Sequence, residues 1–169
     1  MAGNEERSKG TFATGDATVG EIMEEAYSCR FDANLGEVTR LLVERGVSSL
    51  PVVDGERREV GFISDGDIMR AIAAHKTRSV FNGGEATMLY FDDEPLDRKA
   101  RELKHRNVME LATRKVVCAT PEQPIGRVAG LLSKKKFKKL PVIDGDGRLI
   151  GVVRRTSIMR HVFALLFGE

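Results

Sequence analysis

The sequence contains an internal duplication in which the second copy follows the first at an offset of 90 residues. Leu50-Pro-Val-Val-Asp-Gly55 recurs as Leu140-Pro-Val-Ile-Asp-Gly145, and residues 35–72 and 125–162 share 14 identities over 38 positions without a gap. One copy of roughly 55 residues buries too little apolar surface to be comfortably stable by itself. We therefore expect two copies that bury their sheets against each other.

Each copy shows the same order of elements. Apolar side chains at helical spacing predict the main helices, and short apolar runs followed by Asp-Gly turns predict hairpin strands. The expected elements are strands at 27–31 and 115–119, helices at 35–45 and 125–136, strands at 50–53 and 140–143, strands at 60–63 and 149–153, and helices that begin near Asp65 and Thr156. The predicted fold class is therefore α+β, with duplicated β-α-β-β-α units forming a pseudo-two-fold pair.

The repeats also set the predicted domain boundaries. We expect a disordered N-terminus over 1–16, a first repeat over 17–74, a connecting segment over 75–106 and a second repeat over 107–169. The connecting segment is expected to begin as a loop that contains Asn82-Gly83-Gly84. A charged helix over 95–106 follows, and we expect it to pack through Leu96 and Leu103.

Charge and composition argue against several classes of protein. Lys and Arg number 27 against 25 Asp and Glu, a net charge of +2, which is lower than nucleic-acid proteins usually carry. No apolar run reaches the ~18 residues of a membrane span, and MAGNEERSKG lacks the apolar core of a signal peptide. Cys29 and Cys118 are too few for a disulfide framework, and we expect buried thiols in a cytoplasmic protein.

The sequence offers no constellation of residues for catalysis or metal binding. His75, His105 and His161 are isolated from one another, and no Walker-type or dinucleotide glycine loop is present. We therefore expect no enzyme activity, no catalytic residue, no metal and no cofactor.

Several motifs recur in order in the two copies. They are Val19-Gly-Glu-Ile-Met23, Gly46-Val-Ser-Ser-Leu-Pro-Val-Val-Asp54 and Gly61-Phe-Ile-Ser-Asp-Gly-Asp-Ile68 in the first copy, and Asn107-Val-Met109, Lys139-Leu-Pro-Val-Ile-Asp144 and Gly151-Val-Val153 in the second. With these motifs the chain resembles the CBS-domain tandem, or Bateman module, over residues 18–72 and 107–163. The resemblance implies two clefts between the copies. It also implies that these clefts bind adenine nucleotides or related adenosyl compounds, and that this binding usually regulates another domain or protein.

The turn from Ser64 to Asp67 carries the predicted nucleotide chemistry. A carboxylate near a helix start can accept hydrogen bonds from both ribose hydroxyls, and charge-assisted bonds of this kind are strong. The resemblance assigns the ribose and phosphate contacts of this motif to Asp67 and Ser64. The alternative is that both side chains only cap and stabilise the helix that follows.

Five more residues are expected to complete the nucleotide site. The base is expected to lie against Phe62 on one side and against Val117 and Phe137 on the other, where the Val117 backbone reads its edge. Lys138 and Lys139 directly precede Leu-Pro-Val in the second copy, and the resemblance places them within reach of the phosphates.

The second copy departs from the motif. Arg154 stands at the serine position and Ser157 at the acid position, and a serine cannot replace the bidentate grip of a carboxylate on a ribose. We therefore expect one nucleotide per chain. Arg154 and Arg155 either form a second site for a phosphate or another anion, or are a solvated pair at a helix start.

The predicted function is a stand-alone regulatory module that binds AMP, ADP, ATP or an adenosyl compound and signals to an unidentified protein partner. A crowd of apolar residues from Phe163 to Phe167, together with the resemblance, predicts a homodimer. The alternative is a nucleic-acid-associated protein, because residues 108–169 hold 12 Lys and Arg against 5 Asp and Glu. A nucleotide hydrolase is a third candidate, but no general base or metal constellation supports it.

Overall fold

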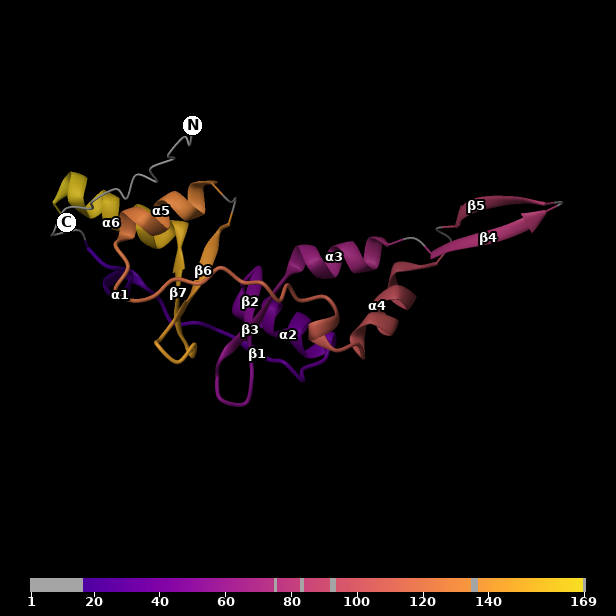
Figure 1. Ribbon diagram of the computed structural model, residues 1–169, viewed down its shortest axis with the longest axis horizontal. Coiled ribbons are helices and arrows are strands. Elements are labelled where there is room, and N and C mark those ends of the chain that lie inside the picture. The colour runs from indigo at the N-terminus through magenta and orange to yellow at the C-terminus, as the bar shows by residue number, and fades with distance from the viewer. Residues whose placement is uncertain (1–16, 75, 83, 92–93, 135–136, 169) are drawn as a thin grey trace, which may run out of the picture. The chain divides into compact units, whose positions relative to one another are not determined.

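The computed structural model describes residues 17–74, 76–82, 84–91, 94–134 and 137–168, which form two compact units (Figure 1). The first-repeat unit contains the described residues of 26–117 together with 146–149, and the second-repeat unit contains those of 1–25, 118–145 and 150–169. Each unit is therefore the body of one repeat together with the segment that leads into the other repeat. The disorder expected over 1–16 lies outside the described residues.

The sheet of the first-repeat unit has the order β1 (Cys29–Arg30), β2 (Ser49–Val53) and β3 (Glu59–Ser64). β1 pairs parallel with β2, and β2 pairs antiparallel with β3 so that Leu50 lies opposite Ile63. All five residues of β2 are buried, as expected for a strand in which four consecutive residues, Leu50–Val53, are apolar rather than alternating with polar ones. The three strands predicted in the first copy are confirmed.

Two helices of this unit begin at capping boxes. α2 (Leu35–Arg45) starts where the Asn34 side chain accepts a hydrogen bond from the Glu37 backbone at 2.9 Å, and it ends at Gly46, whose positive φ of 60° suits glycine. α3 (Asp65–Ala73) starts directly after β3, with Ser64 as its N-cap. Both helices begin where the sequence predicts them.

The connecting segment differs from the expected loop. The structure has an antiparallel hairpin of β4 (Lys76–Asn82) and β5 (Glu85–Phe91), which form a two-stranded sheet of their own (Figure 1). β-Branched and aromatic residues such as Val80 and Tyr90 favour strands, and Gly84 supplies the positive φ of 94° that the turn requires. Asn82 is thus the last residue of β4, and Gly84 directly precedes β5, so the predicted loop is wrong for these two residues.

The charged helix that follows the hairpin is present as α4 (Leu96–Lys104), and the short helix η1 (Val108–Glu110) comes after it. Leu103 belongs to the apolar core of the first-repeat unit, as expected. Leu96 is 67% exposed instead, because it stands in the first turn, where the helix has just begun. Of the two residues predicted to pack, Leu103 is therefore buried and Leu96 is not.

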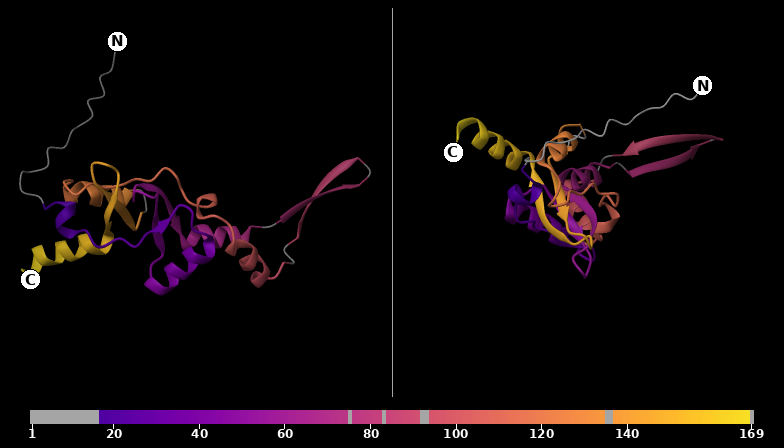
Figure 2. Two further views of the ribbon diagram at one scale, coloured as in Figure 1. Left: turned by 90° about the horizontal axis from the view of Figure 1, so that it is seen from below. Right: turned by 60° about the vertical axis from the view of Figure 1, so that its left-hand side comes forward.

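The second-repeat unit contains α1 (Val19–Ile22), α5 (Ile125–Lys134), β6 (Lys139–Ile143), β7 (Leu149–Arg154) apart from its first residue, and α6 (Arg155–Phe167). The strand expected at 115–119 is reduced to a single parallel bridge between Ala119 and Val142. In both views of Figure 2 the last turns of α6 (yellow) lie at the edge of this unit.

Candidate functional site

The predicted ribose acceptor lies at the junction of β3 and α3. The Ser64 backbone N–H and hydroxyl both donate to Oδ2 of Asp67, at 2.8 Å and 2.6 Å, and the Asp67 N–H donates back to Ser64 Oγ at 3.3 Å. This arrangement is a capping box, so the capping role that the sequence allows is present. It uses one carboxylate oxygen and leaves Oδ1 pointing to other partners.

Oδ1 of Asp67 is taken by Arg70, one turn further along α3. The Asp67 side chain is only 14% exposed, whereas that of Arg70 is 74% exposed. Because water reaches the Arg70 guanidinium and screens its charge, this ion pair contributes little free energy, and a ligand hydroxyl can replace the guanidinium. Arg70 was not predicted as a site residue, although its spacing of three residues from Asp67 is a signal for such a pair.

The other predicted residues of the nucleotide site fall in both units. Phe62 lies two residues before Ser64 on β3, so the two side chains share one face of the strand, and its backbone exchanges two hydrogen bonds with Thr113 at 2.9 Å. Val117 is half-buried in the same unit. Phe137, Lys138 and Lys139 belong to the second-repeat unit, and their part in the nucleotide site stays a prediction.

The second-repeat unit replaces the missing carboxylate of its motif with Glu24. Ser157 Oγ donates to Glu24 Oε1 at 2.7 Å, and Arg160 donates to the same oxygen at 3.0 Å. Arg154 Nε lies 3.5 Å from Oε2. Glu24 was not predicted as a site residue, and its only signal in the sequence is its place directly after the motif that ends at Met23.

Arg155 holds backbone carbonyls in this unit. Its Nε donates to the Phe137 carbonyl at 2.6 Å, and its second guanidinium nitrogen donates to the Leu132 carbonyl at 2.8 Å. The Arg155 backbone N–H also donates to the carbonyl of Lys138, at 3.0 Å. Arg155 therefore connects the end of α5 to the start of α6. Of the two arginines predicted to bind an anion, Arg154 lies near a carboxylate and Arg155 contacts backbone carbonyls.

Lys139 is half-buried at the start of β6, whereas Lys138 is exposed. Desolvation by burial, with a smaller contribution from the nearby charge of Arg154, lowers the pKa of the Lys139 ammonium to about 8. A lysine that is held close to an arginine and shielded from water is suited to an anionic ligand, which would compensate both charges.

A family model described as the CBS domain matches residues 19–74 and 108–164, which is more than half of the chain. The chain belongs to the CBS domain family. The resemblance and the α+β fold predicted from the sequence are therefore confirmed.

Relatives and solved structures agree with this assignment. Protein MJ1426 of Methanocaldococcus jannaschii is 32% identical over 149 residues, which cover 82% of this chain and 87% of that protein. The chloroplastic CBS domain-containing protein CBSX2 of Arabidopsis thaliana is 29% identical, over 86% of this chain and 63% of the relative. A homoserine O-acetyltransferase of Methanohalobium evestigatum is 29% identical, and the match covers only 24% of that enzyme.

Two crystal structures of CBSX2 are similar to the chain at 26% sequence identity. One is a complex with AMP, with a TM-score of 0.67, and it covers 89% of this chain and 98% of its own. The other, described as a CBS-pair protein, has a TM-score of 0.72 and covers 90% and 98%. The fold of this chain thus matches that of a CBS-pair protein over most of the length of both chains.

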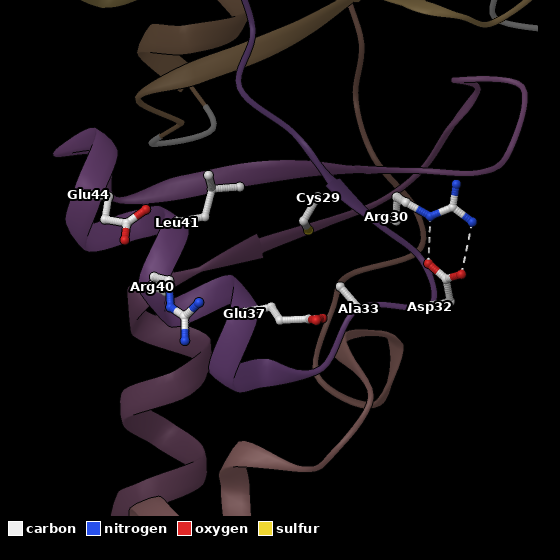
Figure 3. Close-up of a pocket in the computed structure, with 8 residues that line it drawn as sticks. All are labelled: Cys29, Arg30, Asp32, Ala33, Glu37, Arg40, Leu41 and Glu44. Carbon is white, nitrogen blue, oxygen red and sulfur yellow. Dashed lines mark hydrogen bonds and ion pairs between the residues drawn. The ribbon is translucent and has the colours of Figure 1, made fainter.

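A separate cavity of about 530 Å³ lies in the first CBS repeat, between β1 and α2 (Figure 3). Arg30 and Asp32 form a bidentate ion pair at its edge, with two hydrogen bonds of 2.9 Å. Desolvation by burial raises the pKa of the Cys29 thiol to about 11, so this side chain stays protonated and unreactive at neutral pH. None of the predicted nucleotide residues lines this cavity.

The remaining features bear on metals, thiols and membranes. Within the described part of the chain, no group of three or more His, Cys, Asp or Glu side chains is arranged to hold a metal ion. Neither cysteine forms a disulfide in the described part of the chain, and Cys29 is buried whereas Cys118 is half-buried. Among the same residues, no helix is both long enough and apolar enough to cross a membrane.

Proposed function

We propose that this CBS tandem is a regulatory module that binds an adenine nucleotide or a related adenosyl compound through Asp67. The observation that carries the proposal is the Asp67 carboxylate, which is oriented by the capping box through Oδ2 and presents Oδ1 to an exchangeable partner. The solved complex of the similar protein CBSX2 with AMP supports an adenine nucleotide as the ligand class.

The binding chemistry follows from these contacts. A ribose hydroxyl that donates to Oδ1 of Asp67 replaces the bond from Arg70, and it gains a charge-assisted hydrogen bond with a carboxylate already fixed in place. The released guanidinium of Arg70 is then free to approach a phosphate of the same ligand. Phe62 shares the strand face of Ser64 and offers an apolar surface to the base. We propose Lys138 and Lys139 as further phosphate contacts.

We expect a calorimetric titration with AMP to give one site per chain, because only the first CBS repeat carries the acid in its own motif. Adenosine should bind more weakly than AMP, since it lacks the phosphate, and CMP tests whether the base is recognised. A thermal-shift panel of AMP, ADP, ATP and S-adenosylmethionine ranks the ligands, since saturation at 100 times Kd adds about 2.7 kcal/mol of stability. Two equivalent sites, or no binding of any of these ligands, would contradict the proposal.

We also propose that the module signals through a two-fold homodimer or a separate protein partner. Apolar side chains of α6 between 50% and 73% exposed gather on its surface, and they are Met159, Phe163, Leu165, Leu166 and Phe167. Exposed apolar patches of this kind mark protein interfaces.

Sedimentation velocity at micromolar concentration should show a species of twice 18.7 kDa. Leu166→Glu should shift it to the monomer, because a carboxylate in an apolar interface is costly to desolvate. Val43→Glu is the matched control, since Val43 is an exposed apolar residue of α2, a helix of the first-repeat unit and not part of the α6 patch. A wild-type chain that sediments only as a monomer would exclude the homodimer.

The nucleic-acid alternative is less well supported by the structure. Three arginines that contribute to the positive charge of the second repeat are already engaged: Arg154 and Arg160 contact Glu24, and Arg155 holds backbone carbonyls. These contacts hold the three arginines at individual partners within one unit, which does not favour the extended row of cations that would follow a nucleic-acid backbone.

A further inference from the structure

A single carboxylate in the second-repeat unit is surrounded by donors and cations. Glu24 Oε1 accepts from Ser157 and Arg160, and Oε2 faces Arg154. Lys139 adds a third cation, close enough to Arg154 for the two charges to interact. We call these five residues the Glu24 cluster. Two arginines, Arg154 and Arg160, share the single negative charge of Glu24, so these contacts leave a positive charge that the carboxylate does not balance.

The Glu24 carboxylate accepts hydrogen bonds from only some of the donors in the cluster. Arg154 Nε is buried and makes no hydrogen bond among the described residues, because its 3.5 Å distance from Glu24 allows only an ion pair. α6, which is 13 residues long, also begins here without a side-chain hydrogen bond at its N-cap. A phosphate group offers more acceptor oxygens than a carboxylate, and both features favour it.

The Glu24 backbone is fixed while its side chain is not enclosed. Its N–H donates to the Val152 carbonyl at 2.8 Å, and its carbonyl accepts from the Val152 N–H at 2.9 Å. The segment packs so closely that a Cβ at Gly151 would lie 3.0 Å from the Glu24 carbonyl oxygen. The side chain is 27% exposed, so it can rotate away from the cluster without moving the backbone.

We propose that the Glu24 cluster is a binding site for a phosphate group, and that the Glu24 carboxylate occupies it as a tethered competitor until a phosphate-bearing ligand displaces it. Attachment to the chain gives the carboxylate a high effective concentration, so only ligands with several acceptor oxygens compete well. Without a second carboxylate to hold a ribose, the cluster recognises the phosphate rather than the nucleoside. This inference does not depend on nucleotide binding at Asp67.

The test is calorimetric titration with inorganic pyrophosphate at constant ionic strength. Glu24→Gln should bind pyrophosphate about tenfold more tightly than the wild type, because it removes the competing charge but keeps the side-chain size. Glu25→Gln, which removes the same charge from the exposed next residue, should leave the wild-type affinity unchanged. Adding Arg154→Gln to Glu24→Gln should abolish the gain.

Equal affinities in Glu24→Gln and Glu25→Gln would overturn the proposal, since the effect would then be one of overall charge. Absence of pyrophosphate binding in folded Glu24→Gln would overturn it as well. If circular dichroism shows that Glu24→Gln does not fold, Glu24→Asp takes its place. The shorter side chain keeps the charge but reaches the donors poorly, so it should also tighten binding, and a wild-type affinity would again refute the competitor role.

Discussion

Replacing Asp67 with alanine should weaken AMP binding ten- to a hundredfold. In the proposed complex the ribose donates to Oδ1 of Asp67, and loss of a charged hydrogen-bond partner costs about 1.5–3 kcal/mol. The effect should be larger than that of Arg70→Ala, because Arg70 leaves Oδ1 when the ribose binds. Calorimetric titration of both variants with AMP measures the two effects on one scale.

The matched control for this prediction is Asp65→Ala. Asp65 has the same charge and also stands in the first turn of α3, but its side chain is exposed and outside the capping box. Its removal should change AMP affinity by less than about twofold, as expected for a screened surface charge. Asp67→Ala also removes the capping box and should cost about 1 kcal/mol of stability, so both titrations are run well below the melting temperature. Full AMP affinity in Asp67→Ala would exclude Asp67 as the ribose acceptor.

The sequence predicts best the elements whose determinants are local and repeated. α2 begins and ends where Asn34 and Gly46 indicate, and β2 is buried throughout because Leu50 and its neighbours form an apolar run. The hairpin of β4 and β5 was missed because its glycines are typical of loops as well as of turns. What distinguishes a hairpin turn from a longer loop here is the positive φ of Gly84, which the sequence does not reveal.

In the candidate site, too, the sequence predicts the local contacts and misses the long-range ones. Ser64 and Asp67 are three residues apart, so their proximity follows from the start of a helix, and Arg70 lies within the same two turns. Glu24 and Ser157 are 133 residues apart. Their contact depends on a segment leading into the first repeat that packs with the body of the second, which no local pattern reveals. The two repeats thus keep a carboxylate beside a helix start, but they take it from different parts of the chain.

Replacing Lys139 with methionine should raise the free energy of unfolding by on the order of 1–3 kcal/mol at pH 7. Burial and the charge of Arg154 lower the pKa of Lys139 from 10.5 to about 8. Below pH 8 both the folded and the unfolded wild type carry the proton, and the folded state bears the full cost of the desolvated charge. Methionine has a similar length, fills the same space and carries no charge.

The advantage of Lys139→Met should disappear as the pH rises from about 8 to about 10.5. In that interval the unfolded wild type binds more protons than the folded state, so wild-type stability increases with pH and approaches that of the variant. Urea denaturation at pH 7, 9 and 10.5 measures the difference, with Lys138→Met at the exposed neighbouring position as the control. A difference that is zero at pH 7, or that grows with pH, would show that Lys139 is not strained by burial. If the stability difference disappears as predicted, the charge of Lys139 destabilises the folded state. An anion bound beside Arg154 and Lys139 would then stabilise the folded state by compensating that charge.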